Sequence, residues 1–273
     1  MTSKPQGLHP FLNAKLSCLD TAFEGKSFYL FIRILMIINH RNRFIFIANR
    51  KTASTSIGIA LSSTCERKDV ITPLSARDEA IRQDLGYLGP RNFIPWNNKL
   101  NYLKLRIQKK LTKKNINRQL EQIGFHTHIK PQEALQYLNR ECWETYFKFC
   151  FVRNPWDRAI SQYFWVIRGK KDPMDLDTFI NSHSLESAAK NSEEMYTING
   201  KFSVDRLCRY ENVQKEVNRI FEELNLSGSP KLPEAKRQFR SDHRHYRDIL
   251  NDGQAARIAS LFKHEIELAG YSY

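Results

Sequence analysis

The sequence predicts an α/β fold with a short parallel sheet and helices on both of its faces. Two stretches support this prediction, residues 43–63 and 146–168, because each combines a short apolar run, a polar turn and a helix-like segment. Phe44–Ala48 is a continuous run rich in aromatic and β-branched residues, which is typical of a strand buried on both faces. Residues 147–152 repeat this pattern. Strands that alternate with helices form layered α/β domains.

Residues 1–27 have no clear periodicity and contain two prolines and two glycines. We expect residues 1–35 to be an extension outside the main fold, reflecting an upstream start codon, and residues 36–273 to form one domain. The apolar stretch 28–38 is about half the length that a transmembrane helix needs, and Arg33 interrupts it. A buried strand or helix is therefore expected there, and no signal peptide.

The turn after the first apolar run, Lys51–Ser56 (KTASTS), has the features of an anion site. Ser54, Thr55 and Ser56 supply hydroxyls and N-cap character, and a helix can continue through Leu61. The free N–H groups and the positive dipole at the start of such a helix favour an anion, and Lys51 adds a charge. The turn lacks the glycines of a Walker A loop. Taken alone, such a turn is more often a capped helix beside a solvated lysine than an anion site.

The chain is strongly basic, with a formal net charge of +14. This predicts a polyanionic partner, which could be nucleic acid, an anionic lipid surface, a phosphorylated cofactor or an acidic polysaccharide. No acidic residue occurs from Leu85 to Leu120, and the interleaved leucines and isoleucines predict an amphipathic helix with a basic face. This region either captures an anionic acceptor or is a solvated basic surface. A shorter helix is expected over residues 76–85.

A His-x-His pair, His126 and His128, precedes a helix that Pro131 opens. If residues 125–129 are extended, both imidazoles point to the same side of the strand. Histidines of this kind are more often core or surface residues than catalytic groups when no other motif supports them.

The second turn contains Arg153, Asn154 and Pro155, and Ser161 follows two turns into its helix. Asn154 is an N-cap residue and Pro155 suits the first helical position. An arginine fork at a helix N-terminus with a hydroxyl nearby is a suitable phosphate site. Arg153 could equally be a salt-bridged structural residue.

Two further helices are predicted near the C-terminus. Residues 205–226 have amphipathic spacing, and residues 255–269 form a final helix that ends at Gly270, with Tyr271 as an aromatic anchor. Between them, residues 231–247 form a basic loop.

Five cysteines occur without any C-x-x-C pair, and the histidines lack metal-ligand spacing. We expect reduced, mostly buried thiols in a cytoplasmic protein, and no structural metal.

In this order, the two turns resemble the phosphate loops of sulfotransferases that use 3′-phosphoadenosine 5′-phosphosulfate (PAPS). KTASTS is similar to the loop that holds the 5′-phosphosulfate, and RNPWDRAIS (residues 153–161) is similar to the loop that holds the 3′-phosphate. The likeness covers residues 36–273 and is closest to the carbohydrate branch typified by heparan sulfate 2-O-sulfotransferases, especially its short bacterial members. It implies a P-loop-like fold.

The resemblance also implies a role for individual residues. Lys51 would contact the bridging oxygen of the donor, and Arg153 and Ser161 would bind the 3′-phosphate. His128 is the favoured base with His126 as its support, although the choice between the two stays open. The residues implied to wrap the 5′-phosphate are Thr52, Ala53, Ser54, Thr55 and Ser56. The residues implied to close over the nucleotide, unless their loop is merely solvated, are Lys236, Arg237 and Arg240. One departure is Ala48-Asn49-Arg50, which replaces the family's Val-Pro or Ile-Pro and leaves the loop shape open.

The implied reaction moves a sulfuryl group from PAPS to an acceptor hydroxyl and leaves adenosine 3′,5′-bisphosphate (PAP). It is an in-line displacement in which positioning and charge dominate, a histidine accepts the proton and no metal is needed. The acceptor could be an anionic or neutral glycan, a glycolipid or a small molecule, and peripheral contact with an anionic membrane surface is compatible with the charge. No specific nucleic acid is expected. The alternatives are a basic nucleic-acid-binding protein without activity and a P-loop kinase-like phosphotransferase, which the missing glycines and Mg²⁺ carboxylates disfavour.

Overall fold

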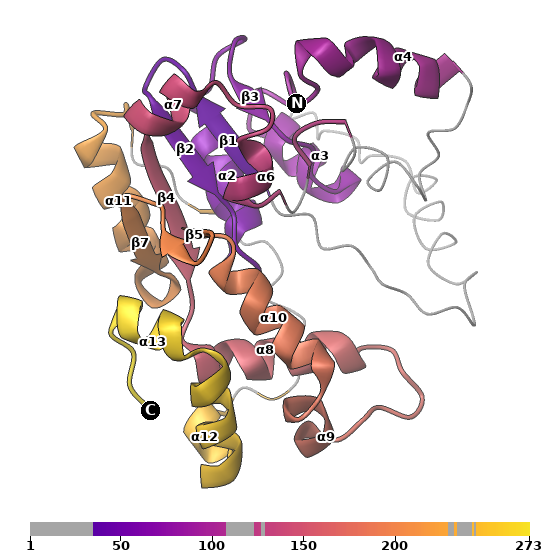
Figure 1. The fold of residues 1–273 in the computed structure, drawn as a ribbon, viewed down its shortest axis with the longest axis vertical. Helices are drawn as coiled ribbons and strands as arrows, with labels where there is room; N and C mark the ends of the chain where they lie inside the picture. The colour runs from indigo at the N-terminus through magenta and orange to yellow at the C-terminus, as the bar shows by residue number, and fades with distance from the viewer. Residues whose placement is uncertain (1–34, 108–122, 127–128, 229–231, 234–241, 243) are drawn as a thin grey trace, which may run out of the picture. The chain divides into compact units, whose positions relative to one another are not determined.

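A computed structural model describes residues 35–107, 123–126, 129–228, 232–233, 242 and 244–273 (Figure 1). These residues include a five-stranded sheet in the order β3-β1-β2-β4-β7. The strands are β1 (Met36–Asn39), β2 (Phe44–Ile47), β3 (Val70–Ile71), β4 (Phe147–Val152) and β7 (Arg206–Arg209). The expected α/β class with a short central sheet is therefore confirmed. The boundary expected at residue 35 stays a prediction.

The sheet is mixed, whereas the sequence predicted a parallel one. β2 pairs in parallel with β4, and β4 with β7, but β1 is antiparallel to both of its neighbours. The reason is the short connection from Asn39 to Phe44, because only antiparallel strands can be joined by so tight a turn. Arg43 closes it with a φ of 53°.

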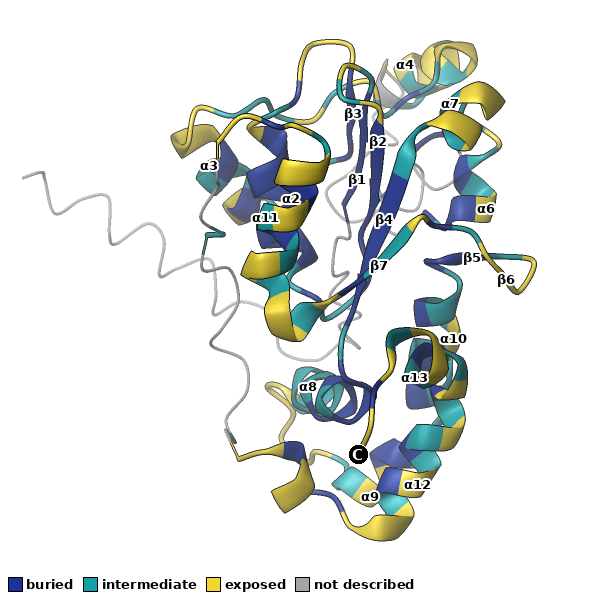
Figure 2. Cartoon of the chain, turned by 90° about the vertical axis from the view of Figure 1, so that its left-hand side faces the viewer, coloured by how far each residue is buried: buried dark blue, intermediate teal, exposed yellow. Residues whose placement is uncertain are grey.

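Helices cover both faces of the sheet, as predicted (Figure 2). On one face, β2 and β4 bury alternate side chains against α2 (Ser54–Ser62) and α11 (Val213–Glu223), while α3 (Ala76–Asp84) packs beside α2. On the other face, the intervening side chains pack against Phe125, Ile129 and Ala134 and against the helices that follow β4. This alternation is that of a strand buried on both sides.

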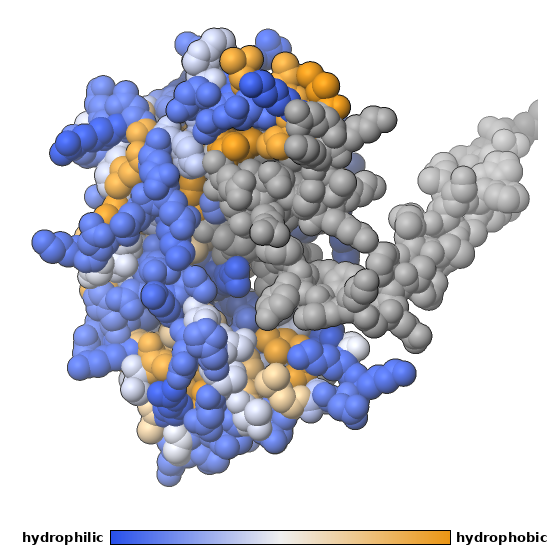
Figure 3. All heavy atoms as spheres, turned by 45° about the vertical axis from the view of Figure 1, so that its right-hand side comes forward, coloured by the Kyte–Doolittle hydropathy of each residue, from blue (hydrophilic) through white to orange (hydrophobic). Residues whose placement is uncertain are grey.

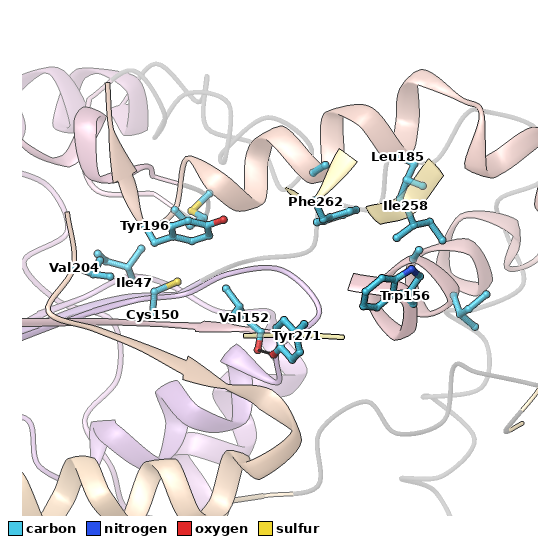
Figure 4. Close-up of a cluster of buried hydrophobic side chains, with 14 of the residues drawn as sticks. Ile47, Cys150, Val152, Trp156, Leu185, Tyr196, Val204, Ile258, Phe262 and Tyr271 are labelled. Carbon is cyan, nitrogen blue, oxygen red and sulfur yellow. Dashed lines mark hydrogen bonds between the residues drawn. The ribbon is translucent and has the colours of Figure 1, made fainter. Parts of the chain in front are cut away.

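A group of helices lies beyond the end of β4 (Figures 1 and 2). Its members are α8 (Pro155–Ile167), α9 (Leu176–Ile180), α10 (His183–Glu193), α12 (Asp252–Leu261) and α13 (Lys263–Ala269). Figure 4 shows Trp156, Leu185, Ile258 and Phe262 meeting in their shared core. The indole N–H of Trp156 donates to the carbonyl of Ala255 at 2.9 Å, which fastens α8 to α12.

Shorter elements complete the described chain. They are η1 (Trp96–Asn98), α4 (Lys99–Ile107), α6 (Pro131–Ala134), α7 (Arg140–Thr145), β5 (Thr197–Ile198), β6 (Lys201–Phe202), η2 (Tyr210–Asn212) and η4 (Tyr246–Asp248). None of the described helices is long and apolar enough to cross a bilayer. The apolar stretch 28–38 enters the described chain only from Leu35, where it forms β1.

Two helix predictions are wrong in part. The helix expected over residues 205–226 begins only at Val213, because residues 206–209 form strand β7 against β4. The final helix is interrupted at Phe262, which ends α12 and precedes α13. The predicted end at Gly270 is confirmed, with φ at 63° in the left-handed region.

The described cysteines are free thiols, and three of them are buried. Burial raises the pKa of Cys65 to about 12 and also raises the pKa values of Cys150 and Cys208. Since thiolates are the reactive form, these three thiols are structural rather than nucleophilic. Cys18 lies outside the described residues.

Gly58 tests the packing of α2 on the sheet. A Cβ at this position would lie 1.5 Å from Cδ2 of Leu35, which is itself 1% exposed. Gly→Ala usually stabilises a helix by about 1 kcal/mol, but overpacking costs about 1–3 kcal/mol. We therefore expect Gly58→Ala to lower the free energy of unfolding in urea. Gly253→Ala in α12 is the control, because its nearest contact is an ordinary 3.5 Å; equal stability of the two variants would refute this packing.

Candidate functional site

The loop between β2 and α2, residues 48–53, takes a tight shape without glycine. Lys51 and Ala53 both adopt left-handed conformations, with φ values of 65° and 54°. The hydroxyls of Thr52 and Ser54 each donate to the carbonyl of Asn49 at 2.9 Å. Those two hydroxyls therefore hold the loop closed around Asn49.

Helix α2 directs its N-terminus into this loop. Its first intrahelical bond runs from the amide of Ile57 to the carbonyl of Ala53, at 3.1 Å. The amides of residues 54–56 therefore lack intrahelical partners, and a helix end of this kind favours an anion. The N-cap residue is Ala53, with no side-chain cap. The expected capping by Ser54, Thr55 and Ser56 is thus wrong, because these three residues form the first helical turn.

The loop between β4 and α8 has the predicted capping. Asn154 accepts from two backbone amides of the first turn of α8, and Pro155 occupies the first helical position. Just before them, Arg153 donates from Nε and Nη2 to a carboxylate oxygen of Asp157, at 2.8 and 2.7 Å. Its Nη1 lies 3.3 Å from the hydroxyl of Ser161. Asp157 therefore fixes the direction of the guanidinium beside Ser161.

Arg153 also joins the two loops. Its Nη1 donates to the carbonyl of Lys51 at 3.1 Å, across 102 residues of sequence. The structure thus brings together three of the predicted site residues, Lys51, Arg153 and Ser161. The parallel pairing of β2 with β4 explains this, because parallel strands end at the same edge of a sheet.

An aromatic ring lies beside this junction. The ammonium of Lys51 is 4.5 Å from the ring centre of Trp165, and the guanidinium of Arg168 is equally distant from the same ring. Both are within the range of cation–π attraction. With Arg153, they concentrate positive charge at this edge of the sheet, which suits a ligand carrying phosphate or sulfate groups.

A buried polar network supports the first loop from behind. Arg158 of α8 donates to the side-chain oxygen of Asn49 at 3.1 Å and also to Ser192 of α10. Ser192 in turn accepts from Asn49 and donates to Glu265 of α13. Arg158 and Glu265 are only 3% and 2% exposed and form an ion pair at 3.6 Å. Burial raises the pKa of Glu265, and the adjacent guanidinium opposes that rise.

The second loop is supported from η2, which follows β7, and from the C-terminus. Glu211 accepts from the amide of Asn154 at 2.6 Å and from the hydroxyl of Tyr271 at 2.8 Å. Tyr271 also reaches the carbonyl of Val152 (Figure 4). The sequence reading did not find Glu211, because it placed this residue inside a helix. It also missed Arg158, although the residue lies within the second motif.

The predicted histidines are only partly described. His126 is buried, and its Nε2 lies 3.8 Å from a carboxylate oxygen of Glu133. Burial lowers the pKa of His126, against the opposing effect of Glu133, so its imidazole is neutral at pH 7. The amide of Ile129 donates to the carbonyl of His126 at 3.4 Å. Residues 127 and 128 lie outside the described part of the chain, so the side to which the two imidazoles would point stays a prediction.

His128 and the basic candidates Lys236, Arg237 and Arg240 lie outside the described residues. Within the described part of the chain, His126 makes no hydrogen bond or ion pair with Lys51 or Arg153. The structure therefore supplies a charged edge and its supports, and leaves the histidine assignment as a prediction. Across the same described ranges, no three His, Cys, Asp or Glu side chains form a group that could hold a metal ion.

Comparison with known proteins gives the family. The model of the Sulfotransferase family matches residues 35–272. An uncharacterised protein of Archaeoglobus fulgidus is 25% identical over 91 residues, which cover 33% of this chain and 76% of that protein. The crystal structure of a sulfotransferase from Alicyclobacillus acidocaldarius aligns with a TM-score of 0.36 and 15% identity, over 81% of this chain and 95% of that one. The assignment rests on the family model, whose match covers most of the sequence: the chain belongs to the sulfotransferase family.

Proposed function

We propose that this chain transfers a sulfuryl group from PAPS to an acceptor hydroxyl of a carbohydrate or glycolipid and releases PAP. The observation that carries the proposal is the contact of the Arg153 guanidinium with the carbonyl of Lys51. PAPS carries a phosphate on the 3′ position of its ribose and a phosphosulfate on the 5′ position, so it needs two anion sites side by side. This contact joins two loops of that kind. The carbohydrate branch, a bacterial cytoplasmic setting and a catalytic domain of residues 36–273 belong to the same proposal.

The described residues fit the donor. The N-terminus of α2 and the ammonium of Lys51 would hold the 5′-phosphosulfate, since the loop that carries Lys51 leads directly into the first turn of α2. Arg153 and Ser161 would hold the 3′-phosphate, with the guanidinium already directed by Asp157. The donor supplies the transferable sulfuryl group. Fixed positive groups around it would stabilise charge on the departing phosphate without reorganising during the reaction.

Proton removal from the acceptor is assigned to His128, with His126 as its support. A neutral imidazole is needed for this step, and burial keeps His126 in that form. The imidazole of His126 lies 3.8 Å from a carboxylate oxygen of Glu133. From this buried position His126 would support His128, which follows two residues later.

Replacing Arg153 or Lys51 by alanine should impair donor binding or turnover without unfolding the protein. We expect Arg153→Ala to weaken PAP binding strongly and Lys51→Ala to lower turnover by about 10²–10³-fold, the loss typical of a charge-stabilising donor. Calorimetric titration with PAP and turnover of radiolabelled PAPS measure the two effects. Arg41→Ala is the matched control, because Arg41 is an exposed, ion-paired arginine on the β1–β2 turn. PAP affinity that is unchanged in Arg153→Ala would contradict the 3′-phosphate assignment.

The two histidines can be told apart by substitution and pH. We expect His128→Ala to lower kcat by about 10²–10⁴-fold while PAP affinity stays unchanged. His126→Ala should cause a smaller loss. Since the base must be neutral, kcat/KM should fall as the pH drops through its pKa, near 6.5 for an ordinary imidazole. Loss of turnover in His126→Ala alone, with an acid limb below that value, would make the buried His126 the base.

The buried network should control the first loop. Glu265→Gln leaves the guanidinium of Arg158 buried beside a neutral amide, so we expect lower thermal stability and, well below the melting temperature, about tenfold weaker PAP binding through displacement of Asn49. Glu193→Gln is the control, because Glu193 pairs with His264 between the same helices, α10 and α13, at a more exposed position. If the melting temperature falls and PAP affinity does not, the network is structural only.

A further inference from the structure

The segment η1–α4 exposes a row of large apolar side chains. Trp96 is 83% exposed, Leu100 72%, Leu103 50% and Ile107 70%. We call these four residues the α4 stripe. Figure 3 shows a hydrophobic area at the upper end of the molecule, where Figure 1 places α4. Large apolar groups that gather on one exposed surface are typical of interaction sites.

The stripe is not the side of the helix that the fold uses. Tyr102 and Leu105 pack against Phe93, Ile94 and Ile123 and so anchor α4 to the domain. At about 100° per residue, Leu100, Leu103 and Ile107 fall within roughly 60° of one another, on the side opposite to Tyr102 and Leu105. The helix therefore has two apolar faces, and the fold covers one.

Lysines border the stripe on both sides. In the same projection, Lys99 and Lys104 flank it, and both are exposed. The ammonium of Lys99 lies 4.5 Å from the ring centre of Trp96. No acidic residue occurs between Leu85 and Leu120. Long lysine stems can lie along apolar groups while their ammonium groups reach outward to anions.

This combination fits one kind of partner. A helix with Leu and Ile on one side, preceded by an exposed Trp in η1, bordered by lysines and free of acidic residues, matches an anionic lipid surface. There the apolar groups enter the acyl boundary and the cations meet the headgroups. A second copy of the chain fits less well, because it would bring the same lysines together on a protein of net charge +14.

We propose that the α4 stripe docks this protein on anionic membrane surfaces. Trp96, Leu100, Leu103 and Ile107 enter the interface, and Lys99 and Lys104 contact lipid phosphates. The proposal goes beyond sulfuryl transfer and does not depend on the identity of the donor.

The test uses the full chain and sedimentation with vesicles. Vesicles of three parts phosphatidylcholine to one part phosphatidylglycerol should bind the protein, and vesicles of phosphatidylcholine alone should bind it far less. Leu100→Glu with Leu103→Glu should lower the partition coefficient at least about tenfold, since each change places a charge in the apolar interface. Lys99→Gln and Lys104→Gln should each lower it about fivefold. Leu85→Glu is the matched control, because Leu85 is a 47% exposed leucine on another helix end and should leave binding unchanged.

Four further measurements test the same surface. Binding should weaken with salt and persist at saturating PAP, which separates lipid phosphates from the nucleotide site. Trp96 fluorescence should shift to the blue with vesicles, and this shift should vanish in Trp96→Phe. The proposal would be overturned by equal binding to both vesicle types or by unchanged binding of the double glutamate variant. It would also be overturned if the wild type formed a dimer without lipid and the double variant did not. PAP titration of the same samples reports on folding; a wild type that binds vesicles but not PAP would contradict the proposed function and leave this surface standing.

Discussion

The parallel pairing of β2 with β4 is the constraint on which the site depends. Phe44 pairs with Phe147 and the register continues to Ile47 beside Cys150, so both strands run toward the same edge of the sheet, and β4 extends two residues further to Val152. Whatever follows each strand must then leave from the same edge. One polar turn and one arginine, a hundred residues apart in sequence, become neighbours for that reason. The aromatic residues of the two strands hold this register by packing on one face, with Phe46 and Phe149 5.4 Å apart between ring centres.

Charge buried behind the loops answers a second requirement. The first loop lacks the glycines and the proline of related loops, so hydrogen bonds must fix its shape. Asn49 is their centre: its carbonyl accepts from two nearby hydroxyls, and its side chain is held from outside the loop by Arg158 and Ser192. A buried guanidinium is tolerated there only because Glu265 neutralises it. Three helices that are distant in sequence thereby converge on one asparagine.

Much of this arrangement could be predicted from the sequence, and the limits have physical causes. Two strands could be predicted, Phe44–Ile47 and Phe147–Val152, because strands buried on both faces are continuously apolar. β7 could not be predicted, because Arg206–Arg209 is half polar and becomes a strand only by pairing with β4. The antiparallel direction of β1 relative to β2 follows from the length of the turn between them, which a search for apolar runs does not test. The paired loops indicated an enzyme rather than a nucleic-acid-binding module, and family membership agrees.

The left-handed backbone at Lys51 and Ala53 has a consequence for how this protein can change. A residue with a Cβ in that conformation raises the energy of the folded chain by about 1–2 kcal/mol, and glycine would relieve it. Glycine would also let the loop adopt more conformations, so the ligand would have to order a loop that folding now orders. Folding stability and pre-organisation for the ligand are therefore opposed at these two positions. A screen for more stable variants would select Ala53→Gly, and that variant would have a less pre-organised loop.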